Sequence, residues 1–256
     1  MLNYLSLELR RMSRDGGYVI MTVVVPAARG AWWPMRSPPS VPAATTLSTH
    51  HRPEMLPTML NRHFAHPQGS LGRLVGRMMA RKNAALTYRV IAAAGLRGNE
   101  TVLEIGCGPG VGLVALAAAL PHGQVLGAEP SVVMRQQAAR RLRDYGHRVD
   151  LVDATADTLP WTAGTIDVVL AINNVQLWQP AAGSLARVHE VLVPGGHLLV
   201  GLSEHAVRSD GSTVPADVDS RLVSELATAG FDIVRQEWEP GGNGRELLVI
   251  ARRGAR

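Results

Sequence analysis

The stretch VLEIGCGPG at residues 102–110 decides the fold, because an apolar strand ends there in a turn with glycines at 106, 108 and 110. Glycine has no Cβ, so the backbone at these positions can adopt positive φ and approach a ligand closely. The helix predicted to follow points its amide N–H groups and the positive end of its dipole at the same place. The stretch therefore predicts a cofactor site at one end of a strand-turn-helix unit.

Glu104 lies within this predicted strand. A buried acid needs a partner such as an ammonium group, because an unpaired buried charge is costly. A dinucleotide-binding enzyme has no evident use for an acid at this position. Glu104 therefore favours a cofactor that carries an ammonium group over a dinucleotide.

Outward from this stretch, apolar segments and helix-compatible segments alternate. Strands are predicted over 101–105, 124–129, 149–153, 166–172 and 197–202, and intervening helices over 111–120, 131–145 and 181–192. Continuous apolar runs of this kind indicate an α/β fold of three layers, with a doubly wound, Rossmann-like parallel sheet between helices. After a predicted helix over 216–229, strands over 231–239 and 246–252 flank a Gly-rich turn, so the last strand is expected to run antiparallel.

Residues 1–60 differ in amino-acid composition from the rest of the chain. Seven prolines and a Ser/Thr/Ala-rich run interrupt any periodic pattern, so this stretch is expected to be a disordered extension. A targeting role and a later translation start, at Met21, Met55 or Met59, are alternatives. The apolar run at 18–25 is too short to span a bilayer, and no stable membrane insertion is expected. Residues 61–98 are predicted to form a helical lid, and 99–256 the main domain.

Composition excludes several classes of function. The formal net charge is +5, but residues 61–256 carry 20 Lys and Arg against 18 acids, without a basic stripe. Nucleic acid is therefore not an expected partner. The single Cys, Cys107, fits a reducing, cytoplasmic compartment. No His or Cys spacing is typical of a metal site.

Polar side chains follow four successive predicted strands. Beyond the glycine turn, strand two ends in Glu129, strand three in Asp153-Ala154, and strand four in Asn173-Asn174. Ligands of open α/β sheets bind outside the carboxyl ends of the strands. Glu129 is spaced from the turn so that it can accept hydrogen bonds from ribose hydroxyls, and Asp153 suits an exocyclic amine.

From about Asn61 onward, the chain resembles the class I S-adenosylmethionine-dependent methyltransferases, and in particular small bacterial members. The resemblance covers five blocks in the family's order: EIGCGPG (104–110), GAEPS (127–131), DATADTLPW (153–161), IDVVLAINNVQLW (166–178) and ARVHEVLVPGG (186–196). It implies seven strands in the order 3-2-1-4-5-7-6, with the last antiparallel. It also implies S-adenosylmethionine as cofactor and methyl transfer by in-line displacement.

The resemblance assigns roles to residues. Glu104 and the turn would hold the methionine end, Glu129 the ribose, Met134 would pack on the adenine and Asp153 would bond its amine. The full set implied to bind cofactor is Glu104, Gly106, Cys107, Gly108, Gly110, Glu129, Pro130, Met134, Asp153, Ala154 and Asn173. Cys107 is interpreted as a packing residue rather than a nucleophile.

The departures from the family's patterns concern the acceptor. The Asn/Asp-Pro-Pro-Tyr signature of nucleic-acid amino methyltransferases is missing after strand four, which disfavours base methylation. The segment at 203–216 is too short for a large cap, which favours a small-molecule acceptor. Candidate pocket residues are Met78, Met79, Asn83, Trp161, Asn174 and Trp178, although such apolar residues also occur in cores.

A general base is optional for this chemistry. His205 is the candidate if the acceptor is a hydroxyl, and the alternative is an exposed loop His without a role. A nicotinamide oxidoreductase and a non-catalytic module of the same fold are the competing functions; the Gly-x-Gly-x-Gly spacing disfavours the first. A monomer or homodimer is expected. The acceptor and the attacked atom are not encoded in these patterns.

Overall fold

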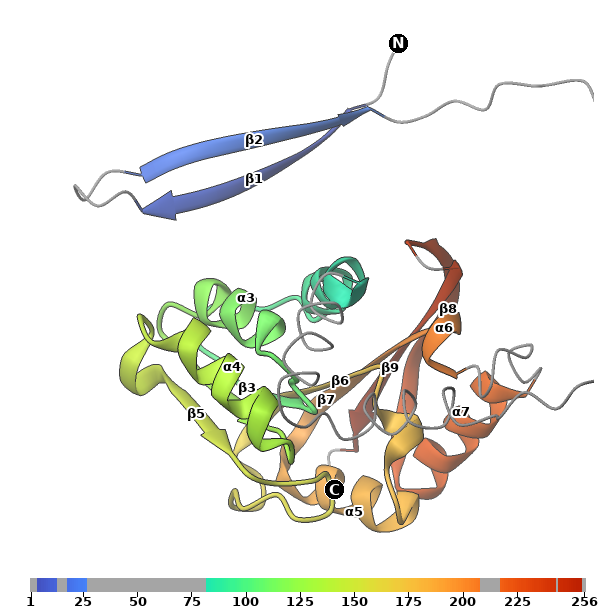
Figure 1. Cartoon of the computed structure of the whole chain (residues 1–256). Helices are drawn as coiled ribbons and strands as arrows, with labels where there is room; N and C mark the ends of the chain where they lie inside the picture. Colours follow the sequence, from blue (N-terminus) through green and yellow to red (C-terminus); the bar gives the residue numbers. More distant parts are fainter. Residues whose placement is uncertain (1–3, 13–17, 27–81, 208–216, 243, 255–256) are drawn as a thin grey trace, which may run out of the picture. The chain divides into compact units, whose positions relative to one another are not determined.

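The computed structural model describes residues 4–12, 18–26, 82–207, 217–242 and 244–254. The chain divides into two compact units, Met1–His51 and Arg52–Arg256. The second unit contains a seven-stranded sheet with the order β5-β4-β3-β6-β7-β9-β8 (Figure 1). In chain order of the strands this is 3-2-1-4-5-7-6, so the predicted topology is confirmed.

The centre of the sheet is parallel. It consists of β3 (Thr101–Ile105), β4 (Gln124–Ala128), β6 (Ile166–Ile172) and the first part of β7 (Leu192–Ser203), with β5 (Val149–Val152) at one edge. β8 (Phe231–Gly241) and β9 (Gly244–Arg253) form a hairpin, and β9 is antiparallel to both β7 and β8. The predicted reversal of the last strand is therefore confirmed.

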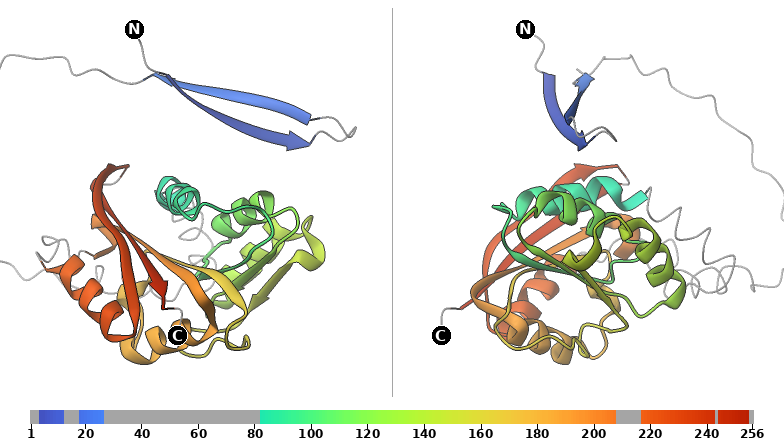
Figure 2. Two further views of the ribbon diagram at one scale, coloured as in Figure 1. Left: turned by 180° about the vertical axis from the view of Figure 1, so that it is seen from behind. Right: turned by 90° about the vertical axis from the view of Figure 1, so that its left-hand side faces the viewer.

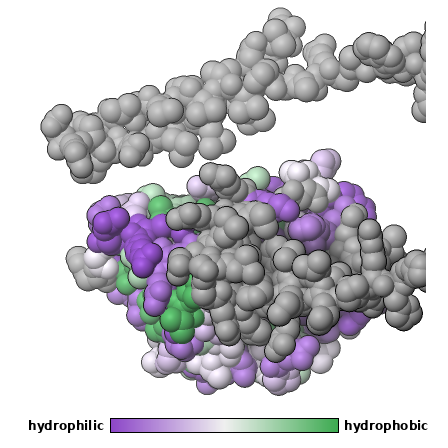
Figure 3. All heavy atoms as spheres, in the orientation of Figure 1, coloured by the Kyte–Doolittle hydropathy of each residue, from purple (hydrophilic) through white to green (hydrophobic). Residues whose placement is uncertain are grey.

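Helices cover both faces of this sheet and make two separate cores (Figures 1 and 2). One core joins the sheet to α3 (Val111–Ala119), α4 (Val132–Leu142) and a helix over 82–93, which is teal in Figure 2. The other joins it to α5 (Ala181–Val191) and α7 (Val218–Thr228). On the face seen in Figure 3, hydrophilic residues cover most of the described surface.

The helix over 82–93 is fixed at two places. Leu86 and Val90 are buried against Gly201 of β7, whose lack of a side chain lets the helix approach. Arg89 forms ion pairs with Glu239 at 3.2 Å and Glu246 at 3.4 Å, which ties the helix to the β8–β9 hairpin. The described part of the predicted lid is therefore a packed helix; residues 61–81 lie outside the described residues.

Several boundaries differ from the predicted ones. α4 ends at Leu142 rather than at residue 145, and a short 3₁₀ helix, η1 (Gly146–Arg148), leads into β5. β7 begins at Leu192, five residues earlier than predicted, because its pairing with β6 jumps from Leu192 to His197 around the Pro-Gly-Gly turn. Two short helices, η2 (Val175–Leu177) and α6 (Glu204–Val207), have no periodic pattern and were not predicted.

The first unit contains an antiparallel hairpin of β1 (Tyr4–Met12) and β2 (Tyr18–Pro26). Both strands lie within residues 1–60, the stretch that the sequence predicts to be a disordered extension. The run at 18–25 is rich in Val and Ile, which favour strands. Residues 27–60 lie outside the described residues. Within the described ranges, no helix is long and apolar enough to cross a membrane.

Candidate functional site

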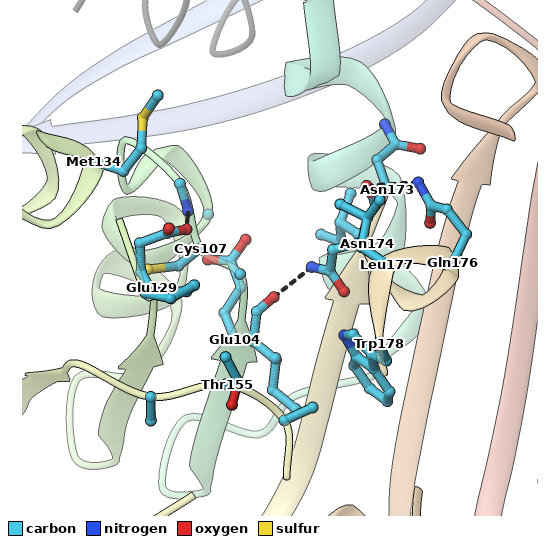
Figure 4. A pocket seen from close by; sticks show the side chains of 18 of the residues that line it. Glu104, Cys107, Glu129, Met134, Thr155, Asn173, Asn174, Gln176, Leu177 and Trp178 are labelled. Atoms are coloured by element: carbon cyan, nitrogen blue, oxygen red, sulfur yellow. Dashed lines mark hydrogen bonds between the residues drawn. The ribbon is translucent and has the colours of Figure 1, made fainter. Parts of the chain in front are cut away.

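A cavity of about 650 Å³ opens at the carboxyl ends of β3, β4, β5 and β6 (Figure 4). This is the edge at which the sequence predicts a cofactor site. Two walls face each other across it: Cys107, Glu129 and Met134 lie on one side, and the segment from Asn173 to Trp178 lies on the other, with Glu104 between them (Figure 4). The cavity is large enough for a nucleoside and a small second molecule.

Gly106 and Gly108 of the glycine turn line the cavity, whereas Gly110 packs on α4. Gly106, Gly108 and Gly110 have φ values of +60°, +53° and +83°, which glycine adopts without the strain that other residues incur. A Cβ on Gly106 would lie 2.6 Å from Nδ2 of Asn174, and one on Gly110 would lie 2.8 Å from Cα of Ala138. Gly108 has open space around it. The three glycines are thus required for different physical reasons.

This difference gives a testable comparison. We expect Gly106→Ala to lower the free energy of unfolding by about 2–3 kcal/mol, because it adds backbone strain and displaces a hydrogen-bonded amide. Gly108→Ala adds only the strain, so it should cost roughly 1 kcal/mol. Urea denaturation of the two variants measures the difference. Equal losses would show that the contact with Asn174 does not contribute.

Glu104 is the most unusual group of the site. Its side chain is buried, and its Oε2 has no hydrogen-bond partner among the described residues. Burial, with a smaller contribution from the negative charge of Glu129, raises the pKa of Glu104 to about 8. A Cβ on Gly112 would lie 2.4 Å from both carboxyl oxygens, so α3 begins directly against this side chain. The arrangement suits a cationic ligand, which would favour the ionised form.

Glu129 follows β4 and is held by main-chain donors. The N–H of Gly108 donates to Oε2 at 2.9 Å, and the N–H of Ser131 donates to Oε1 at 2.8 Å. A carboxylate oxygen can accept more than one hydrogen bond, so bonds from the main chain do not exclude bonds from a ligand. Pro130 and the buried Met134 line the cavity beside it. Ser131 also caps α4, since its Oγ accepts from the N–H of Met134 at 3.4 Å.

Two of the predicted cofactor residues, Gly110 and Asp153, do not line the cavity. The carboxylate of Asp153 forms an ion pair with Arg135 at 2.7 Å, and its side chain is 66% exposed. The next residues, Ala154, Thr155 and Ala156, do line it. The loop after β5 therefore faces the cavity mainly with the residues that follow Asp153.

The second wall begins with two asparagines after β6. Asn173 has φ +54°, which is unusual for a residue other than glycine, and its Oδ1 accepts from the N–H of Ser203 at 2.8 Å. Nδ2 of Asn174 donates to the carbonyl of Ile105 at 2.6 Å, which fixes the orientation of this amide (Figure 4). Its Oδ1 is buried without a partner among the described residues. That oxygen is available to a hydrogen-bond donor of a ligand.

The other predicted acceptor residues fall into three groups. Asn83 and Trp178 line the cavity, and Trp178 also belongs to a core. Trp161 does not line it: its Nε1 donates to Asp150 at 3.3 Å and its ring packs against the core on the α5 side. Met78 and Met79 lie outside the described residues.

The two candidate nucleophilic or basic residues also differ in position. His205 lies in α6, is exposed, and is not among the lining residues. Cys107 lines the cavity, but burial raises the pKa of its thiol well above the usual value, which disfavours the reactive thiolate. Within the described ranges, no group of three His, Cys, Asp or Glu residues could hold a metal ion.

Some lining residues were missed in the sequence. Thr87 lies one helical turn after Asn83, and the i, i+4 spacing is the signal that could have found it. Asp157, an exposed acid of the loop after β5, also lines the cavity. Gln176 and Gln179 follow the two asparagines and extend the second wall. Gln176 lies in the short 3₁₀ helix η2, which gives no periodic signal, and Gln179 follows this helix.

Residues 102–196 match a protein family described as a methyltransferase domain. An uncharacterized methyltransferase of Bacillus subtilis, YdaC, is 26% identical over 160 residues, which are 62% of this chain and 86% of YdaC. A trans-aconitate 2-methyltransferase of Methylobacterium radiotolerans is 29% identical over 142 residues, or 55% of this chain. The match spans about half of that relative's length, 49%.

Among solved structures, an S-adenosylmethionine-dependent methyltransferase from Aquifex aeolicus has the same fold. The two structures agree with a TM-score of 0.58 at 19% sequence identity, over 68% of this chain and 92% of the other. At this identity the similarity concerns the arrangement of the sheet and helices.

Proposed function

Because this chain contains a methyltransferase domain of the class I, S-adenosylmethionine-dependent family, we propose that it transfers a methyl group to a small molecule bound in the cavity after β6. S-adenosylmethionine supplies a methyl carbon attached to a sulfonium, which is an excellent leaving group. The chain's residues then have to align the two reactants and exclude water. Alignment alone can contribute effective molarities of about 10⁵–10⁸ M.

The observation that carries the proposal is the unpartnered carboxyl oxygen of Glu104. A buried acceptor without a partner costs roughly 1–3 kcal/mol, and more when it is charged. An ammonium group is the partner that compensates this cost, and the amino acid end of S-adenosylmethionine carries one. Glu104 and the glycine turn would hold that end, with Glu129 at the ribose and Met134 at the adenine. The hydrogen bond between Asp153 and the adenine amine stays a prediction.

The second wall supports an acceptor that is small and polar. Five amide-bearing residues line the cavity: four lie on or next to the second wall, and Asn83 lies on the helix over 82–93; the four are Asn173, Asn174, Gln176 and Gln179. Amides both donate and accept hydrogen bonds without carrying charge. The unpartnered Oδ1 of Asn174 favours an acceptor that presents a hydroxyl or N–H group. A neutral amide does not take up the proton, so the displaced proton would leave through solvent. We also propose that the protein is a monomer or a homodimer and that it is located in the cytoplasm.

Calorimetric titration tests the proposal directly. S-adenosylmethionine and its demethylated product, S-adenosylhomocysteine, should bind in the micromolar range, with NAD as the control ligand. Glu129→Ala should weaken both by about 10–100-fold, because it removes a charged acceptor of the ribose hydroxyls. Asp157→Asn, which changes an exposed acid of the same cavity, is the matched control.

The competing functions give different results. Saturable NAD binding without S-adenosylmethionine binding would support an oxidoreductase and contradict the proposal. Binding without turnover of any small acceptor would support a non-catalytic module. Transfer of label from methyl-labelled cofactor to a hydroxyl- or amine-bearing acceptor would support methyl transfer.

A further inference from the structure

α4 contacts three loops of the cofactor cavity on the side away from the cavity. These are the glycine turn at 106–110 and the loops that follow β4 and β5. Arg135, Ala138 and Arg141 follow at intervals of three residues, so they lie near one another on the helix surface. None of the three lines the cavity. Each contacts a residue or loop that does, so any effect on a bound ligand would pass through those loops.

Arg135 joins the ends of two strands. Its NH1 donates to the carbonyl of Glu129 at 2.6 Å, just after β4, and its NH2 pairs with Asp153 at 2.7 Å, just after β5. The planar guanidinium can make both contacts at once, which a lysine ammonium at the same place does less well. The Arg135 side chain is only 18% exposed, which limits its freedom to make other contacts. Arg135 thus fixes the main chain next to the carboxylate proposed for the ribose.

Ala138 and Arg141 hold the glycine turn instead. Gly110 packs so closely on α4 that an added Cβ would lie 2.8 Å from both Cα and Cβ of Ala138. NH1 of Arg141 donates to the carbonyl of Pro109 at 2.6 Å. The turn at 106–110 is therefore held from behind by a contact and a charge-assisted hydrogen bond.

From these contacts we infer that Arg135 and Arg141 are positioning residues, Arg135 for the nucleoside end of the cofactor and Arg141 for the turn at its amino acid end. This inference rests on the proposed function. Holding loops in their binding geometry before the ligand arrives lowers the ordering cost of binding. Each arginine therefore positions the residues around a different end of the cofactor.

Two ligands separate the two roles. S-adenosylhomocysteine carries both ends, whereas 5′-methylthioadenosine carries the nucleoside without the amino acid. Arg135→Ala should weaken both ligands about 10-fold, since one partly exposed charged donor is lost. Arg141→Ala should weaken S-adenosylhomocysteine about 10-fold and leave 5′-methylthioadenosine within twofold. Arg135→Lys should restore part of the affinity, because it keeps a single cationic donor.

Arg140→Ala is the matched control, because Arg140 is the same residue type on the same helix and is exposed. Melting temperatures of the ligand-free variants show whether each is folded. Losses that are equal for the two ligands in both arginine variants, or no larger than in Arg140→Ala, would overturn the inference while leaving the proposed function intact. A wild type that binds neither ligand would overturn the proposed function and the inference together.

Discussion

Glu104→Gln is expected to weaken S-adenosylmethionine binding about 100-fold, because it replaces a buried carboxyl group with a neutral amide. Among the described residues, Oε2 of this carboxyl group has no hydrogen-bond partner. The same change should make the ligand-free protein more stable above pH 8. The folded-state pKa of about 8 lies above the usual 4.5, so the folded protein keeps a proton that the unfolded chain releases between these values. Wild-type stability therefore falls, through this group, as the pH rises from about 4.5 to about 8.

The pH dependence of binding distinguishes loss of the Glu104 charge from a structural disturbance of the cavity by the substitution. A cationic ligand binds the ionised form, so wild-type affinity should rise with pH up to about 8 and then level off. Glu104→Gln should remove this rise. Asp157→Asn should keep it, since Asp157 is an exposed acid of the same cavity. Titration calorimetry and urea denaturation at several pH values give both quantities; a variant with the wild-type pH profile of binding would contradict the role of Glu104.

Gly201→Val is expected to lower the free energy of unfolding by about 3 kcal/mol through overpacking. A Cβ at this position would lie 2.6 Å from Cγ2 of Val90 and 3.2 Å from Cδ1 of Leu86. The helix over 82–93 would have to move away from β7. Because this helix carries Asn83 and Thr87 to the cavity, ligand affinity should also fall.

A second substitution tests whether the helix contact is the cause. Val90→Ala removes the atoms that clash, so Gly201→Val combined with Val90→Ala should recover at least half of the lost stability. Val90→Ala alone leaves a small cavity and should destabilise by about 1–2 kcal/mol. Urea denaturation of the four proteins measures the coupling. Additive losses would show that the two positions do not interact.

The sheet could be predicted because its signals are local. β3 and β6 occur at their predicted bounds, since each is a continuous apolar run between turn residues. β7 begins before its predicted start because Leu192 already pairs with β6, five residues before the pairing resumes at His197. The sequence of neither strand indicates this pairing. The N-terminal hairpin was missed because the prolines after residue 26 dominate the composition of the whole stretch.

The cavity could be predicted only in part. Residues directly after strands, such as Glu129 and Asn174, line it because topology alone brings strand ends together. Asp153 and Trp161 show the limit of this argument. Each has a hydrogen-bonding partner at the surface, Arg135 and Asp150, and these contacts between distant residues leave no pattern in the sequence.

The two walls of the cavity are encoded by separate segments of the chain. Asn173 and Asn174 are anchored to Ser203 and Ile105 by their amides, whereas Gln176 and Leu177 follow them in the 3₁₀ helix η2 and are exposed. This short segment can therefore be replaced, as in a chimera, while the glycine turn, Arg135 and Arg141 stay unchanged. Acceptor preference can in this way diverge without any change in the part of the cavity that is proposed to hold the methyl donor.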